Sequence, residues 1–236
     1  MITSNLSELT IHEEIGIITI CNSKKNHITI PEFVELNVLD NFINTNKLKA
    51  IIITGRGKHF SHGADFNLIS CSSNNLSDLK DKLTLGKALL DYIENLPIIT
   101  LAAVNGACFG AGLEIALSCQ FRIASEKAFL GLPESNLNII PGMDGIKRLA
   151  KLLTKQQAIQ LSITGNIISS SDSFEIGLVD KIADPCLDES IIFINEIIAQ
   201  KSLKQINAII STINSTINHQ EISDDSFLEF VKDLSK

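Results

Sequence analysis

The sequence predicts an α/β fold, because segments with the pattern of strands alternate with segments with the pattern of helices. Short, fully apolar stretches at 50–54 and 98–104 are typical of strands buried in a sheet. Between them, residues 76–96 form a long helical stretch that ends before Pro97. A strand, a long helix and a second strand in this order are the basis of the predicted class.

The remaining elements are predicted in chain order from local pattern. Apolar stretches on either side of Glu13 and Glu14 predict a β-hairpin. Pro31 is expected to begin a helix whose apolar side runs to Ile43. A glycine-rich turn at 110–112 is expected to open an apolar helix. Further strands are predicted at 121–124 and 128–130, and further helices at 145–153, 155–163 and 171–176.

The pattern changes after Pro185, where isoleucines recur at helical spacing and no strand signal remains. The clearest stretch is 203–217, which is predicted to be an amphipathic helix. We therefore predict a core over 1–185 and a helical C-terminal region over 186–236.

Composition excludes several classes of function. A formal net charge of −7, a single Tyr and no Trp argue against a nucleic-acid-binding surface. The five cysteines have no Cys-x-x-Cys spacing, so we expect neither a zinc site nor a disulfide framework. We see neither a secretory signal nor an apolar run of the ~18 residues that a membrane span needs. The expectation is a reduced, cytoplasmic protein with no membrane partner.

Two glutamates are the candidate catalytic residues. Glu114 lies among apolar residues just after the glycine-rich turn, so burial is expected to raise its pKa. Glu134 follows a short strand-like segment and Pro133. Two carboxylates at the ends of neighbouring elements are suited to paired acid–base chemistry.

The motifs around these residues resemble the enoyl-CoA hydratase/isomerase (crotonase) superfamily. Residues 105–114 have the form Asn-Gly-x-x-x-Gly-x-Gly-x-Glu, and Pro133-Glu134 and Ile140-Pro141-Gly142 follow in the family's order. Upstream is Phe60-Ser61-His62-Gly63-Ala64-Asp65, and downstream is Gly177-Leu178-Val179-Asp180. The resemblance covers roughly residues 9–185. It implies a crotonase-like spiral of ββα turns, followed by a C-terminal helical region that helps to build a homotrimer or a dimer of trimers.

The resemblance also implies how the site works. The backbone N–H groups of Ala64 and Ala111 would form an oxyanion hole for a thioester carbonyl. Glu114 and Glu134 would add water across the double bond of a 2-enoyl thioester. The expected substrate-binding residues are Ala64, Asp65, Phe66, Ala111 and Gly142. Coenzyme A would arrive as part of the substrate, with no permanently bound cofactor and no metal. The family usually has Gly where Ala111 stands.

Three other functions remain open from the sequence. The first is double-bond isomerisation of an enoyl-CoA. The second is dehydration of an acyl chain on an acyl-carrier protein, as in polyketide-type biosynthesis. The third is a catalytically degenerate oligomeric scaffold, for which Ala111 and a C-terminal end that is short for the family are the arguments.

Asp144 is a third carboxylate near the proposed site. It directly precedes the predicted helix at 145–153, and Asp is a preferred N-cap residue. We therefore expect Asp144 to cap this helix rather than to transfer a proton.

Overall fold

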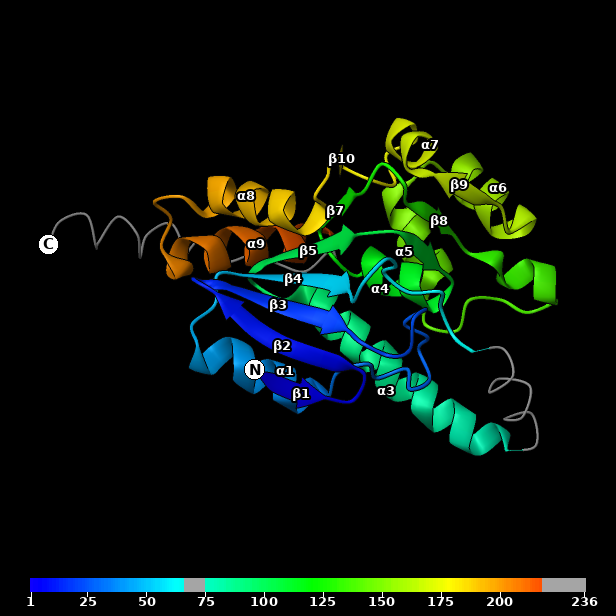
Figure 1. Ribbon diagram of the computed structural model, residues 1–236, viewed down its shortest axis with the longest axis horizontal. Coiled ribbons are helices and arrows are strands. Elements are labelled where there is room, and N and C mark those ends of the chain that lie inside the picture. Colours follow the sequence, from blue (N-terminus) through cyan, green and yellow to red (C-terminus); the bar gives the residue numbers. More distant parts are fainter. Residues whose placement is uncertain (66–74, 218–236) are drawn as a thin grey trace, which may run out of the picture.

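A seven-stranded sheet forms the central layer of the described part of the protein, which is residues 1–65 and 75–217 of the computed structural model (Figure 1). In spatial order its strands are β1 (Ile2–Ser4), β2 (Ser7–His12), β3 (Ile15–Ile20), β4 (Ala50–Gly55), β5 (Ile99–Val104), β7 (Phe121–Ala124) and β10 (Lys181–Ile182). The first three strands pair antiparallel, and from β3 onward all neighbours are parallel. The α/β prediction and the predicted hairpin are thereby confirmed.

Helices cover both faces of this sheet (Figure 1). α1 (Leu36–Thr45) and α3 (Leu76–Asn95) pack on one face, and α8 (Cys186–Ile198) and α9 (Leu203–Ile217) pack on the other. Alternate residues of β4 supply the two cores, with Ile51 and Ile53 on the α1 side and Ile52 on the α8 side. A strand buried on both faces must be apolar throughout, which is the reason for the continuous apolar run in the sequence.

A second, three-stranded sheet carries the elements that surround the candidate site. Its strands are β6 (Ala107–Phe109), β8 (Phe129–Gly131) and β9 (Ile167–Ser169). The helical elements that join or flank them are α4 (Ala111–Leu117), the 3₁₀ helix η1 (Pro133–Leu137), α5 (Gly145–Leu152), α6 (Lys155–Thr164) and α7 (Ser170–Glu175). β6 and β9 were not predicted, because each is defined by pairing with distant segments: both pair with β8, and β6 also pairs with Ser61.

The helix predicted from Pro31 begins later, at Leu36. The intervening residues form bends, and Phe33 and Val34 are fully buried. The Phe33 carbonyl accepts hydrogen bonds from the N–H of Leu6 and the hydroxyl of Ser7. These bonds to the N-terminal strands hold the segment in a non-helical path, so a tertiary contact overrides the local helical pattern.

The amphipathic prediction for 203–217 is confirmed in α9. Ile206 and Ile210 are buried against the sheet, whereas Ile209, Ile213 and Ile217 are 51–59% exposed. Because α8 and α9 share a core with the strands, the helical region is packed on the sheet; its division from 1–185 as a domain stays a prediction.

Candidate active site

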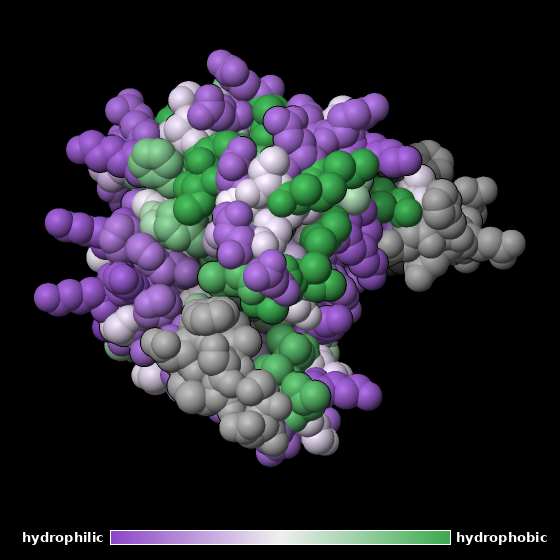
Figure 2. Space-filling view, turned by 90° about the vertical axis from the view of Figure 1, so that its right-hand side faces the viewer, coloured by the Kyte–Doolittle hydropathy of each residue, from purple (hydrophilic) through white to green (hydrophobic). Residues whose placement is uncertain are grey.

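A cavity of about 540 Å³ beside α3 brings together the candidate residues that the structure describes. Ala64, Asp65, Ala111, Glu114, Glu134 and Gly142 all line it, and Phe66 lies outside the described residues. Most of the other lining side chains are apolar, among them Ile28, Pro31, Leu79, Leu83, Ile139, Ile140 and Met143. Figure 2 shows apolar side chains gathered on the side of the molecule that lies to the right in Figure 1. Of the apolar residues that line the cavity, Ile140 is 75% exposed. The cavity therefore combines an apolar wall with a few polar groups, as binding sites for small molecules do.

Two glycine turns meet at the cavity. Gly63 has φ +80° and Gly110 has φ +50°, so both adopt the left-handed conformation that glycine favours. A Cβ on Gly63 would lie 2.5 Å from the Phe109 carbonyl oxygen and 3.3 Å from the Ala111 nitrogen, which shows how closely the turns approach. Backbone hydrogen bonds of Ser61 with β6 hold them together.

The N–H groups proposed as oxyanion donors follow these turns directly. Within the described residues, no acceptor takes the N–H of Ala64 or Ala111. Ala111 is the first residue of α4, where an N–H has no partner in the helix. Gly110, rather than Ala111, takes the positive φ, so the alanine at 111 adds a methyl group without backbone strain.

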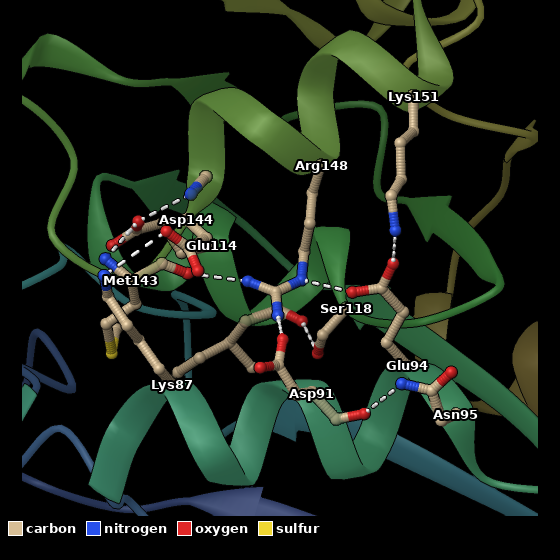
Figure 3. Close-up of polar contacts among 12 residues, drawn as sticks. Lys87, Asp91, Glu94, Asn95, Glu114, Ser118, Met143, Asp144, Arg148 and Lys151 are labelled. Carbon is tan, nitrogen blue, oxygen red and sulfur yellow. Dashed lines mark hydrogen bonds and ion pairs between the residues drawn. The ribbon is translucent and has the colours of Figure 1, made fainter. Parts of the chain in front are cut away.

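Glu114 is held by the start of a neighbouring helix (Figure 3). It is 2% exposed on α4, and its Oε1 accepts hydrogen bonds from the N–H groups of Met143 at 2.8 Å and Gly145 at 2.9 Å. Burial raises the pKa of Glu114, whereas the two N–H groups and the Arg148 charge act in the opposite direction. The expected burial and raised pKa are confirmed.

Glu134 lies in η1, and its side chain packs against Gly110. A Cβ on Gly110 would be 2.8 Å from the Glu134 Oε1, so glycine is also needed there for space. Burial, and next the charge of Glu114, raise the pKa of Glu134 to about 7. Its Oε2 is buried and has no hydrogen-bond partner among the described residues. A carboxyl group with this pKa can both hold and release a proton near neutral pH.

The prediction that the Asp144 side chain caps the helix at 145–153 is wrong, although Asp144 does stand at the N-cap position. Asp144 precedes α5, but its side chain makes no capping hydrogen bond and its φ is +67°. In that left-handed conformation the carboxylate points to Lys87, whose Nζ is 3.3 Å from Oδ1 (Figure 3). Glu114 accepts hydrogen bonds from the N–H groups on either side of Asp144, those of Met143 and Gly145.

Sequence reasoning missed the residues that hold Glu114. Met143 and Gly145 act through backbone N–H groups, which carry no side-chain signal. Arg148 donates to the Met143 carbonyl oxygen at 2.6 Å and was not singled out. The one sequence signal for Arg148 was the spacing of charged residues at 144, 148 and 151, which places them along one side of a helix.

The described residues contain no group of three or more His, Cys, Asp or Glu side chains that could hold a metal ion. Among the same residues, no helix is long and apolar enough to cross a bilayer.

Comparison with known proteins identifies a family. The family model described as enoyl-CoA hydratase/isomerase matches residues 10–227. A Bacillus subtilis protein named "Probable enoyl-CoA hydratase" is 36% identical over 176 residues, which are 74% of this chain and 68% of that protein. The fatty acid oxidation complex subunit alpha of Idiomarina loihiensis is 37% identical over 134 residues, 56% of this chain but only 19% of that subunit.

A solved structure gives the same result for the fold. The enoyl-CoA hydratase of Bacillus anthracis is 28% identical, has a TM-score of 0.80, and the match covers 97% of this chain and 89% of that one. The predicted crotonase-like fold is thereby confirmed. Together with the match of the family model over most of the sequence, this likeness shows that the chain belongs to the enoyl-CoA hydratase/isomerase family.

Proposed function

We propose that this protein is an enoyl-CoA hydratase, which adds water reversibly across the double bond of a 2-enoyl thioester. One observation carries the proposal: the buried Glu114, the half-buried Glu134 and two backbone N–H groups that have no acceptor among the described residues line the same cavity. The N–H groups suit a carbonyl oxygen that gains negative charge, and the carboxyl groups suit transfer of the protons of one water molecule.

The proposed reaction balances with water as the only co-reactant. The water oxygen bonds to the β-carbon while one of its O–H bonds breaks and the proton passes to a glutamate. The electron pair of the double bond moves toward the carbonyl oxygen, where the N–H groups of Ala64 and Ala111 stabilise the charge. The α-carbon then takes a proton from a glutamate, and the product is a 3-hydroxyacyl thioester.

The environments of the two glutamates support different roles. The two N–H groups on Glu114 Oε1 favour its carboxylate form, which suits the base that activates water. Glu134 has a pKa of about 7 and a buried oxygen with no hydrogen-bond partner among the described residues, which suits the group that gives a proton to the α-carbon. Because the charge of Glu114 raises the pKa of Glu134, the two groups titrate as a pair.

The cavity wall supports an acyl thioester as substrate. Leu79, Leu83 and Met143 offer an apolar surface to the acyl chain, and Gly142 leaves room beside it. We propose that Asp65 and Phe66 contact the substrate near the oxyanion hole, and that coenzyme A is its carrier without any permanently bound cofactor. Acyl-carrier protein is the alternative carrier.

The test is incubation with crotonyl-CoA, followed by ultraviolet absorbance and mass spectrometry. Loss of the conjugated enoyl band with a gain in mass of one water supports hydration. A 3-enoyl-CoA that converts to the 2-enoyl isomer, with no hydration of crotonyl-CoA, would instead establish isomerisation. Turnover of neither substrate on coenzyme A or on carrier protein would favour the scaffold.

We also propose that the protein assembles as a homotrimer or a dimer of trimers. The support is the exposed row of Ile209, Ile213 and Ile217 on α9, which recurs every four residues and therefore lies on one side of the helix. Exposed apolar side chains in such a row are typical of surfaces that contact another chain.

A further inference from the structure

Helices α3 and α5 are joined by a ladder of charges next to Glu114 (Figure 3). The ladder consists of Lys87, Asp91 and Glu94 on α3, and of Asp144 with Arg148 and Lys151 of α5 on the other side. The spacing is four and then three residues on both sides, so each set lies along one side of its segment. At one end of the ladder Lys87 pairs with Asp144, and at the other end Lys151 pairs with Glu94. Between them, Arg148 pairs with both Asp91 and Glu94.

Arg148 is the buried member of this ladder. Its side chain is 3% exposed, and its Nη2 and Nε lie 2.5 Å from Asp91 and 2.8 Å from Glu94. Its third contact is with the backbone: Nη1 donates to the Met143 carbonyl oxygen at 2.6 Å. A buried cation needs such partners, and the planar guanidinium serves three of them at fixed directions.

The contact with Met143 links Arg148 to the candidate site. Met143 is held at both ends, because its carbonyl oxygen accepts from Arg148 and its N–H donates to Glu114. The next donor to Glu114 is Gly145, two residues later in the same turn. Within the described residues, these hydrogen bonds reach only Oε1 of Glu114, so Oε2 is the oxygen left for a substrate water.

We propose that Arg148 is a positioning residue for Glu114: by holding the 143–145 turn to α3, it fixes the two N–H groups that orient the Glu114 carboxylate. The role in catalysis rests on the proposed hydratase function, whereas the role in holding Glu114 does not. Arg148 is not among the residues that line the cavity, so it acts through the turn.

The charges around Glu114 fix the sign of the expected effect. Burial and Asp144 raise the pKa of Glu114, and the N–H groups of Met143 and Gly145 lower it together with the charge of Arg148. The other charged groups on the packed elements are Lys147 and Lys151 on α5, Glu134 in η1, and Asp78, Lys80, Asp81, Lys82, Lys87, Asp91 and Glu94 on α3. Loss of Arg148 removes a cation and loosens two donors, so both effects move the pKa of Glu114 upward.

The experiment compares Arg148→Met and Arg148→Lys with a matched control, Arg122→Met. The Arg122 side chain is also 3% exposed, and it also donates to backbone carbonyl groups, among them those of Cys119 and Leu178. Unlike Arg148, it is not among the groups that shift the pKa of Glu114. Each variant is checked for folding by circular dichroism. The pH profile of kcat/KM is then measured, and the pKa of Glu114 is measured directly by NMR of the ¹³C-labelled carboxyl group, assigned with Glu114→Gln.

We expect Arg148→Met to lose about 10²-fold in kcat with little change in KM, as misplacement of a reacting group does. The acid limb of its kcat/KM profile should move to higher pH, and the pKa of Glu114 measured by NMR should rise. Arg148→Lys, which keeps the charge and can donate to Met143, should recover part of both effects. Arg122→Met should lower the melting temperature but leave the pKa of Glu114 in place.

A folded Arg148→Met protein with an unchanged Glu114 pKa would overturn the proposal, as would an equal shift in Arg122→Met. If Arg148→Met does not fold, the pKa of Glu114 is measured in Arg148→Lys and in Glu94→Gln, which removes one ion-pair partner of Arg148. The NMR measurement needs no turnover, so a wild type that hydrates nothing would refute the proposed function while the positioning of Glu114 is still tested.

Discussion

Oε1 of Glu114 accepts a hydrogen bond of 2.9 Å from the N–H of Gly145, so a carboxyl group on α4 binds the first residue of α5. The start of a helix carries N–H groups without helical partners and a partial positive charge. Both favour the carboxylate form of Glu114 and oppose its burial, which is the largest influence and raises its pKa. This contact couples the position of a helix to the protonation of a candidate catalytic base, and it underlies the first prediction.

Gly145→Ala should disable the site without unfolding the protein. The new Cβ would lie 2.7 Å from Cγ and 3.0 Å from Oε1 of Glu114, so the carboxyl group must move. Alanine is otherwise better than glycine in a helix by roughly 0.5–1 kcal/mol, so the local helix is not weakened. We expect hydration of crotonyl-CoA to fall by about 10²-fold. Ile146→Ala, at the next and partly exposed position, is the control, and near-normal activity of Gly145→Ala would contradict the role of this contact.

Glu114→Gln and Glu134→Gln should each depress hydration by about 10²–10⁴-fold. Both groups are proposed to act on one water in one step, so the double variant should be little worse than the poorer single variant. Steady-state kinetics of the three proteins measure this. A single variant with wild-type turnover would remove that residue from the mechanism.

The raised pKa of Glu134 should make the protein less stable as pH rises. Its ordinary pKa is 4.5, and the folded value is about 7, so between these values the folded state binds more protons than the unfolded chain. The free energy of unfolding contributed by this group is therefore greatest below pH 4.5 and is lost as pH rises through 7. Glu134→Gln should raise the melting temperature relative to wild type more at about pH 8 than at about pH 4. An equal difference at both pH values would refute the shift.

The backbone of Asp144 should matter more to stability than its carboxylate. At φ +67° an alanine is strained, so Asp144→Ala should lose about 1–2 kcal/mol in urea unfolding. Asp144→Asn tolerates this conformation and gives up only a partly exposed ion pair with Lys87, so it should stay close to wild type in stability. Hydration by Asp144→Asn should stay within a few-fold of wild type. A folded variant that loses about 10²-fold would instead make Asp144 a proton-transfer residue.

The exposed isoleucines of α9 should hold an oligomer together. Multi-angle light scattering at micromolar concentration should give the mass of three or six chains. Ile213→Asp, at the middle of the exposed row, should reduce that mass, whereas Ser211→Asp, at an exposed position on the same helix outside the row, serves as the charge control. A monomeric wild type would refute the prediction.

The sequence by itself predicted the α/β class, the hairpin, α3 and α9, because their apolar patterns are long enough to show a period. It also identified Glu114, since a carboxylate among apolar residues after a glycine turn is unusual, and Glu134 from its place after a short strand-like segment and Pro133. The burial and raised pKa of Glu114 followed from that local context, whereas the raised pKa of Glu134 was not predicted.

Tertiary structure alone decided the features that depend on a distant partner. Residues 31–35 are not helical because Phe33 is bonded to the N-terminal segment, and β6 exists only through its pairing with β8 and with Ser61. Asp144 makes no capping hydrogen bond: its backbone is left-handed and its carboxylate pairs with Lys87 on α3, while Glu114, 30 residues earlier, accepts from the N–H groups on either side of it. No local pattern contains these contacts, since each joins segments that only the folded chain brings within hydrogen-bond distance.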